Sequence, residues 1–357
     1  MKKYILYVLS LYLFINPIIA TNVLIVAPER FSTSSDLLSI PLLYGEGELP
    51  STCVVDTKLN EITPDILTSR GSNLFWAPSG TVLTPAECDL VDQARGAFGV
   101  VRLVQSMWRH TLDSFPKVCP VTGCTPLCKA LDNWNKQPIL TIDSHAKCET
   151  GCQLNAYYDP STHTLVFPQF LDKGRMKYTC SSFDVIAHES GHACLNAMCP
   201  DLLSSDRSDY SALHESFGDL TALFASLDIA TSLEQSRWLS SPHTGTCIGG
   251  DLTGTCIRDP HDGHSVSCEP HDLSKPLTRF MCNYMSHLWK TRTKGASTRD
   301  ILYQAQQDFL EAMLYNLDSE NILQSIIDYF ATHKVSIRDS YFAALTAQFT
   351  SCSLIDA

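Results

Sequence analysis

Positive charge is scarce in this chain. The 357 residues include 26 Lys and Arg against 38 Asp and Glu, so the formal net charge is −12. An acidic surface repels phosphate groups and anionic lipids, and it also repels acidic substrates. We therefore expect no nucleic-acid partner, no attachment to an anionic membrane surface and no acidic substrate.

Long hydrophobic runs are also lacking. The most apolar stretch, Tyr4–Ile15, is short for a membrane span, which needs about 20 residues. It follows the basic residues Lys2 and Lys3 and is broken by Pro17, a pattern typical of a secretory signal peptide. We expect residues 1–20 to be this signal and the mature protein to be secreted or periplasmic, without a membrane partner. An uncleaved anchor is the alternative, and no Cys follows Ala20 as in a bacterial lipoprotein.

Two further features are missing from residues 231–270, a segment with little periodicity. No acidic spacing there matches a calcium-binding loop, so no calcium site is predicted. Its doubled Thr-Gly-Thr-Cys is too short to be a structural repeat. The segment is predicted to be a loop, as is the Cys- and Pro-containing stretch 116–137.

Cysteine, by contrast, is abundant. All 15 cysteines follow the predicted signal, which indicates a disulfide framework in an exported protein. The odd count leaves at least one thiol free or bonded to another chain, and Cys194 is a candidate buried free thiol. The alternative is a zinc cluster at Cys119, Cys124 and Cys128, although their spacing matches no standard ligand pattern.

The most informative stretch is 180–219, which contains an H-E-x-x-H pattern from His188 to His192. Residues four apart on a helix lie on one face, about 6 Å apart along the axis. His188 and His192 can therefore both direct an imidazole nitrogen at one ion. Glu189 flanks that position, where a carboxylate can take a proton from an activated water molecule.

The surrounding sequence predicts the helices that this geometry needs. Ser181 and Asp184 read as a capping box, and Pro200 ends the first helix. A second helix is predicted over Tyr210–Leu227, with Glu215 off its apolar stripe and Asp219 one turn later. We interpret Glu215 as a third metal ligand and Asp219 as a carboxylate that orients a ligand imidazole. An isolated H-E-x-x-H also occurs by chance, and this second acidic pair favours the metal-site interpretation.

The segments DVIAHESGHA and ALHESFGDLTALF together resemble the thermolysin-like zinc metallopeptidases, in which a glutamate on the next helix completes the zinc site. The resemblance covers about 86–227. It implies His188, His192 and Glu215 as Zn²⁺ ligands, Glu189 as the catalytic base and Asp219 as an outer partner. His214 departs from the family, whose best-known members have Asn before the ligand glutamate.

The same resemblance assigns roles outside the metal motif. Asn155-Ala156-Tyr157 is similar to the family's edge strand, which implies that this segment pairs with an extended substrate backbone. In that family, a histidine near the start of a later helix donates a hydrogen bond to the oxyanion, and the resemblance implies such a residue here. His271 is the first candidate for this role and His264 the second. Tyr210 is a weak candidate for the tyrosine that assists in the family.

The predicted fold class is α+β, a two-lobed thermolysin-like arrangement with a small mixed sheet. Residues 21–200 would form the N-terminal α/β lobe, and residues 201–357 a mainly helical C-terminal lobe, with the zinc site in the cleft between them. The predicted strands are Asn22–Ala27, Cys53–Asp56, Leu74–Ala77, Pro138–Asp143, Gln153–Tyr158 and Thr164–Phe167. The predicted helices, besides the two at the motif, are 86–113, His271–Trp289, Arg299–Tyr315, Asn321–Ala331 and Ile337–Phe349.

These observations predict a secreted zinc peptidase that hydrolyses peptide or protein substrates. Two alternatives stay open. One is a catalytically silent binding protein in which zinc is structural and held partly by Cys180, Cys194 or Cys199, since structural sites favour four closed ligands. The other is a zinc amidase that acts on a non-protein substrate such as cell-wall material.

Overall fold

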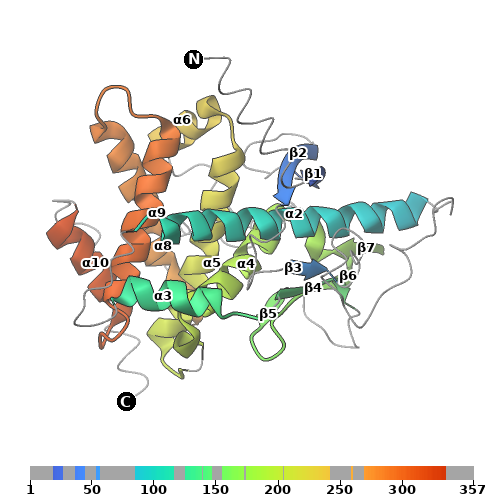
Figure 1. Ribbon diagram of the computed structural model, residues 1–357, viewed down its shortest axis with the longest axis horizontal. Coiled ribbons are helices and arrows are strands. Elements are labelled where there is room, and N and C mark those ends of the chain that lie inside the picture. Colours follow the sequence, from blue (N-terminus) through green and yellow to red (C-terminus); the bar gives the residue numbers. More distant parts are fainter. Residues whose placement is uncertain are drawn as a thin grey trace.

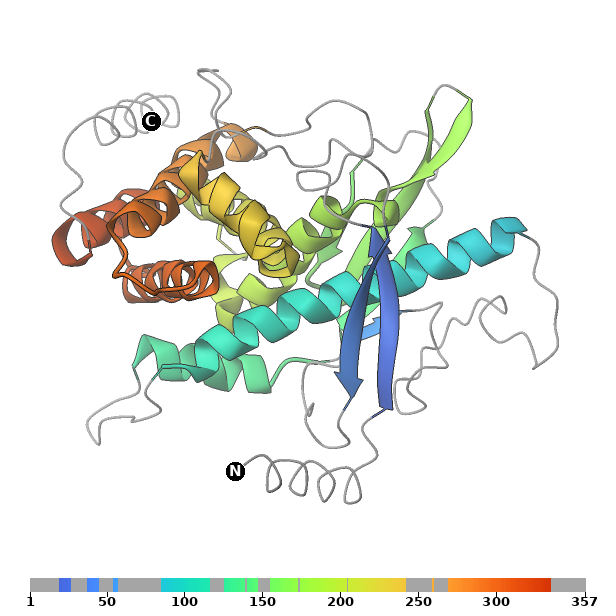
Figure 2. The ribbon, with the colours of Figure 1, turned by 90° about the horizontal axis from the view of Figure 1, so that it is seen from above.

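The long helix α2 (Pro85–Asp113) runs across the molecule in both ribbon views, with strands at one end and helices α9 and α10 at the other (Figures 1 and 2). The structure is a computed structural model. It describes residues 19–26, 37–44, 54–56, 85–115, 125–138, 140–146, 155–172, 174–203, 205–241, 259 and 269–334. Helix α2 matches the predicted helix 86–113.

Helix α2 has one buried apolar face. Apolar side chains recur at steps of three or four residues, which places them on one side of the helix. The buried members are Ala94, Phe98, Val101, Val104, Trp108 and Leu112. Helix α2 contacts strands β1, β3 and β4 and helices α4, α5 and α9. Its buried residues belong to the same core as those of the other helices.

The strands form two sheets. Strands β1 (Ile19–Val26) and β2 (Leu37–Tyr44) pair antiparallel. The second sheet contains β3 (Val54–Asp56), β4 (Leu140–Ala146), β6 (Thr164–Asp172) and β5 (Tyr157–Asp159), in that order, and β7 (Arg175–Tyr178) also pairs with β6. The pairs β3–β4 and β4–β6 are parallel, and β5–β6 and β6–β7 are antiparallel. This confirms the small mixed sheet and places β5 at its edge.

Helices make up most of the rest. In chain order they are α3 (Pro126–Asn135), α4 (Phe183–Met198), α5 (Ser208–Ile229), α6 (Ser232–Ser240), α8 (Pro270–Thr291), α9 (Thr298–Tyr315) and α10 (Ile322–His333), with 3₁₀ turns η2 (Thr179–Ser181) and η3 (Pro200–Leu202). The fold is therefore mixed α+β and mainly helical. Helices α4 and α5 pack against each other across the predicted lobe boundary at residue 200.

Two local predictions were wrong, and two strands, β2 and β7, were not predicted. Part of the predicted loop 116–137 is helix α3, because Thr125 caps it, Pro126 fits the first turn and Trp134 is buried. Part of 231–270 is helix α6, which begins with a capping box between Thr231 and Glu234. Strand β2 was not predicted, since its apolar run around Pro41 does not alternate.

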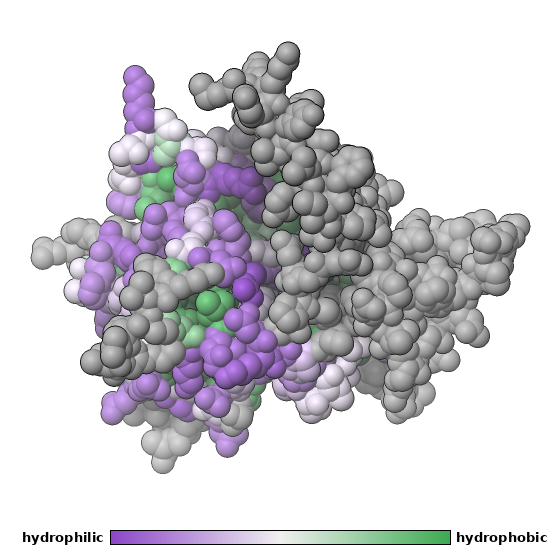
Figure 3. Space-filling view, viewed as in Figure 1, coloured by the Kyte–Doolittle hydropathy of each residue, from purple (hydrophilic) through white to green (hydrophobic). Residues whose placement is uncertain are grey.

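Other predictions fall outside the described residues. These are the strand at 74–77, the helix at 337–349, His264, and residues 1–18 of the predicted signal. The last two residues of that predicted signal, Ile19 and Ala20, belong to β1. Among the helices that the structure describes, none has the length and apolar character needed to cross a membrane. The described residues on the face in Figure 3 are mainly hydrophilic, with small hydrophobic areas between them.

Two cysteines, one within helix α4 and one at its C-cap, can be tested directly. Cys194 and Cys199 are free thiols and buried, as predicted for Cys194. Burial raises the pKa of Cys199 to about 12, and it raises that of Cys194 further. Because the thiolate is the reactive form, neither should react with an alkylating reagent at pH 8 until the protein is unfolded. Mass spectrometry of the labelled peptides checks this, and rapid labelling of the native protein would contradict it.

Candidate metal site and cleft

Helix α4 carries the H-E-x-x-H pattern as predicted. Its N-cap is Ser182, whose hydroxyl accepts a hydrogen bond from the Val185 backbone N–H at 3.3 Å. The predicted cap, Ser181, instead donates to the Tyr178 carbonyl within the preceding turn. The helix ends at Met198, before Pro200 begins the next turn. Local capping thus fixes where the helix begins and, with it, which residues face the cleft.

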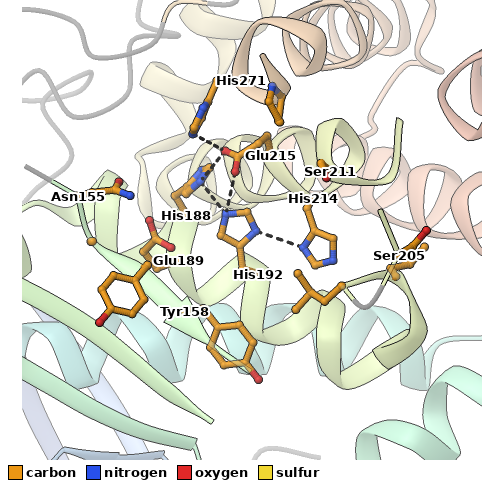
Figure 4. A pocket seen from close by; sticks show the side chains of 15 residues that line it. Asn155, Tyr158, His188, Glu189, His192, Ser205, Ser211, His214, Glu215 and His271 are labelled. Carbon is orange, nitrogen blue, oxygen red and sulfur yellow. Dashed lines mark hydrogen bonds and ion pairs between the residues drawn. The ribbon is translucent and has the colours of Figure 1, made fainter. Parts of the chain in front are cut away.

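The two histidines of the pattern converge. The Nε2 atoms of His188 and His192 are 3.0 Å apart, and the two rings are perpendicular. Glu215 on α5 completes the group, with its carboxylate oxygens 3.4 Å from His188 Nε2 and 3.7 Å from His192 Nε2 (Figure 4). In a tetrahedral zinc site with bonds of about 2.0–2.2 Å, neighbouring ligand atoms lie roughly 3.3 Å apart. The donor atoms present here therefore fit a small divalent cation.

Glu189 lies beside the same point. One ligand atom each from His188, Glu189 and His192 lie within 4.8 Å of one another, so this group by itself could hold a metal ion. Two carboxylates, from Glu189 and Glu215, are therefore available to the histidine pair. Glu215 faces both Nε2 atoms at the distances given above, whereas Glu189 lies at one side of the pair in Figure 4. Glu215 thus faces the Nε2 atoms of both histidines, and Glu189 is a second carboxylate at the cluster.

Both histidines also have a contact at Nδ1, their second ring nitrogen. Asp219 Oδ1 lies 2.9 Å from His188 Nδ1, at a site where both side chains are almost fully buried. His214 Nδ1 lies 3.4 Å from His192 Nδ1. Partners at Nδ1 orient an imidazole and leave Nε2 for the metal. Asp219 thus contacts the first histidine of the pattern and His214 contacts the second.

Protonation states differ within the cluster. Burial alone would raise the pKa of Glu215, but hydrogen bonds from His188 and His271 and the nearby imidazoles outweigh it and hold that pKa well below its usual range. Burial lowers the pKa of His214 to about 4. Near pH 7, Glu215 is therefore an anion and His214 is neutral. An anionic carboxylate is one of the ligand types that a zinc site uses.

Two glycines allow α4 and α5 to approach. A Cβ on Gly218 would lie 2.6 Å from His188 ring atoms, and a Cβ on Gly191 would lie 2.8 Å from Thr221 Oγ1. Thr221 in turn accepts a hydrogen bond from Trp108 Nε1 of α2 at 3.0 Å. The ring of His188 thus occupies space that any larger residue at 218 would take. The prediction from sequence missed this role, although a glycine inside a helix is itself a signal of close packing.

The cluster opens into a pocket of about 320 Å³. One side is formed by Asn155, Ala156, Tyr157 and Tyr158; the edge strand β5 begins only at Tyr157, so Asn155 and Ala156, which were predicted to lie in the strand, precede it. The other side is formed by the turn after α4 and the start of α5, whose members Leu202, Leu203, Ser205 and Ser211 were not predicted. The edge strand and the metal ligands, far apart in sequence, therefore border one cavity (Figure 4).

His271 reaches the same pocket from the start of α8. Its Nε2 lies 3.1 Å from Glu215 Oε2, and its Nδ1 contacts the carboxylate of Glu269, the N-cap of the helix. Tyr210 does not line the pocket, because its hydroxyl donates to the Leu317 carbonyl at 2.6 Å. Of the two predicted oxyanion donors that the structure describes, only His271 borders the cavity.

Comparisons with known proteins add no assignment. No protein-family model matches the chain, and no match is found among curated proteins or solved structures. The molecule is thus established as a mainly helical α+β protein with a His-Glu-His cluster that could hold a metal ion.

Proposed function

We propose that this protein is a zinc-dependent peptidase of the thermolysin-like type. The observation that carries the proposal is the convergence of two histidine Nε2 atoms with the Glu215 carboxylate, beside Glu189, in a pocket bordered by an edge strand. Each part has a separate chemical use, and hydrolysis of an extended peptide needs all of them together.

His188, His192 and Glu215 would hold the ion. Zn²⁺ bound there supplies a Lewis acid that polarises a carbonyl and lowers the pKa of water. Glu189, one residue after His188 and lining the pocket, accepts a proton from the attacking water and passes it to the departing amine. His271 lines the same pocket; its Nε2 would leave Glu215 and turn to the substrate, where its N–H could donate to the carbonyl oxygen as negative charge develops there.

Substrate binding is assigned to the rim formed by Asn155, Ala156 and Tyr157. Asn155 and Tyr157 are exposed, and Ala156 between them is buried. An extended peptide can add to such an edge through backbone hydrogen bonds, which do not depend on side-chain identity. The chain's acidic balance is consistent with neutral or basic substrates, and export remains part of the proposal on the strength of residues 1–20.

The alternative of a closed structural zinc site has less support. Such sites usually include cysteine ligands. Among the described residues that line the pocket, none is a cysteine, and Cys194 is buried elsewhere. The open pocket also suits a bound substrate better than a closed ligand shell.

Removal of the metal provides the direct test. The purified protein should cleave members of a mixed peptide library, lose this activity in a chelator, and regain it when Zn²⁺ is restored, whereas Mg²⁺ should not restore it. Murein fragments in a parallel assay separate the amidase alternative. Cleavage that persists after complete zinc removal, or stoichiometric zinc without cleavage of any peptide, would contradict the proposal.

A further inference from the structure

Tyr158 joins the edge strand to the metal helix. Successive side chains on a strand point to opposite faces, and Tyr157 is exposed while Tyr158 is partly buried against the core. The hydroxyl of Tyr158 accepts a hydrogen bond from Asn196 Nδ2 at 2.9 Å and lies 3.1 Å from His163 Nδ1. Asn196 is buried in α4, one turn after His192. A single side chain thus connects the rim of the cleft to the helix that carries both histidines.

The direction of these hydrogen bonds follows from their chemistry. The amide nitrogen of Asn196 can only donate, so the Tyr158 oxygen accepts from it and gives its own proton to His163 Nδ1. Burial raises the pKa of Tyr158 to about 12 and lowers the pKa of His163. Near pH 7 the phenol therefore keeps its proton and the imidazole keeps a lone pair. The three side chains form one oriented chain.

The far end of this chain is fixed by the hairpin turn. His163 has a φ of 51°, the only non-glycine residue with positive φ in the described part of the protein. Its carbonyl accepts a hydrogen bond from the Thr141 N–H of β4 at 2.8 Å. The same turn is closed by Asp159, whose carboxylate accepts from the Ser161 N–H at 2.9 Å. A residue held in this sparsely populated conformation indicates that the surrounding structure specifies it.

We propose that the Asn196–Tyr158–His163 chain sets the position of strand β5 relative to the metal helix, which makes Tyr158 and Asn196 positioning residues for extended peptides. This inference rests on the proposed peptidase function. Substrate backbone bound along Asn155–Tyr157 has to present its scissile carbonyl to the cluster on α4. The hydrogen-bond chain links those two parts through Tyr158, which itself lines the cleft.

The kinetic test uses Tyr158→Phe, which removes the hydroxyl and keeps the ring. For a peptide long enough to lie along β5, kcat/KM should fall about tenfold, mainly through KM, as expected for one lost hydrogen bond. For a short substrate that reaches only the cluster, kcat/KM should not change, and neither should zinc affinity. Tyr315→Phe, at an exposed tyrosine outside the pocket, is the matched control. Equal losses for both substrates, or no loss for the long one, would overturn the inference.

Variants at Asn196 and His163 test the hydrogen-bond chain itself. Adding Asn196→Ala to Tyr158→Phe should cause little further loss, because both substitutions break the same bond. His163→Gly relieves the positive φ but removes the acceptor, so it should reproduce the loss. His163→Asn should restore much of the activity, since Asn tolerates this backbone conformation and carries an acceptor. If the losses from Tyr158→Phe and Asn196→Ala add fully in the double variant, or if His163→Gly behaves like the wild type, the proposal is contradicted.

Amide hydrogen exchange separates this inference from the peptidase proposal. In Tyr158→Phe, exchange at residues 157–166 should rise about tenfold, while exchange in α4 stays at its wild-type level. If the wild-type protein cleaves neither peptide, the peptidase proposal fails. Amide hydrogen exchange then decides by itself whether the Asn196–Tyr158–His163 hydrogen-bond chain anchors β5. Unchanged exchange in the hairpin would refute the anchoring role, whatever the activity.

Discussion

Glu189→Gln should keep zinc and Glu215→Gln should lose it, while both variants should lose peptide cleavage. Glu189→Gln is expected to keep stoichiometric zinc and lose about 10²–10⁴-fold in kcat, because a carboxamide cannot accept the proton from water. Glu215→Gln is expected to weaken zinc binding by more than about 100-fold, since even the loss of an outer partner typically costs 10–100-fold. Metal content after dialysis and peptide cleavage measure the two effects.

The comparison is informative because the geometry offers two carboxylates to one histidine pair. Glu189 belongs to the group whose ligand atoms lie within 4.8 Å, whereas Glu215 faces both Nε2 atoms directly. Glu320→Gln, at an exposed glutamate that does not line the pocket, controls for the loss of one negative charge. If Glu189→Gln loses the metal and Glu215→Gln retains it, the two roles are exchanged.

Gly218→Ala should damage both stability and metal binding. The added Cβ would lie 2.6 Å from the Cε1 and Nδ1 atoms of His188, whose ring is itself packed against Asp219. Overpacking of this kind typically costs about 1–3 kcal/mol of the free energy of unfolding. Because the ring has to move, its Nε2 should leave the cluster and zinc affinity should fall as well. Thermal unfolding with and without zinc measures both effects.

The same substitution in a His188→Ala background provides the control. Without the imidazole, the new methyl group meets no ring, and replacing glycine by alanine inside a helix should then stabilise the protein by up to about 1 kcal/mol. The sign of the effect of Gly218→Ala is thus expected to reverse with the residue at 188. A loss of stability of the same size in both backgrounds would show that the glycine serves helix packing in general.

The sequence by itself predicted the elements whose evidence is local. Helices α2, α4, α5, α8 and α9 follow from apolar residues at helical spacing and from their end signals. The convergence of His188 and His192 follows from the pitch of one helix, and Glu215 and Asp219 from the spacing within the next. Helix α3 was missed although Thr125 and Pro126 are local signals of its start, and strand β2 was missed because its apolar run does not alternate.

Tertiary structure decided everything that depends on how two elements approach each other. The close crossing of α4 and α5 at Gly218, the contact of His214 with His192, and the link from Tyr158 to Asn196 join residues 20 or more positions apart. No spacing in the sequence encodes such distances, because helix geometry repeats every 3.6 residues while packing depends on the shapes of both surfaces. The chemical groups of the candidate site were therefore readable from the chain, but the fit between them was not.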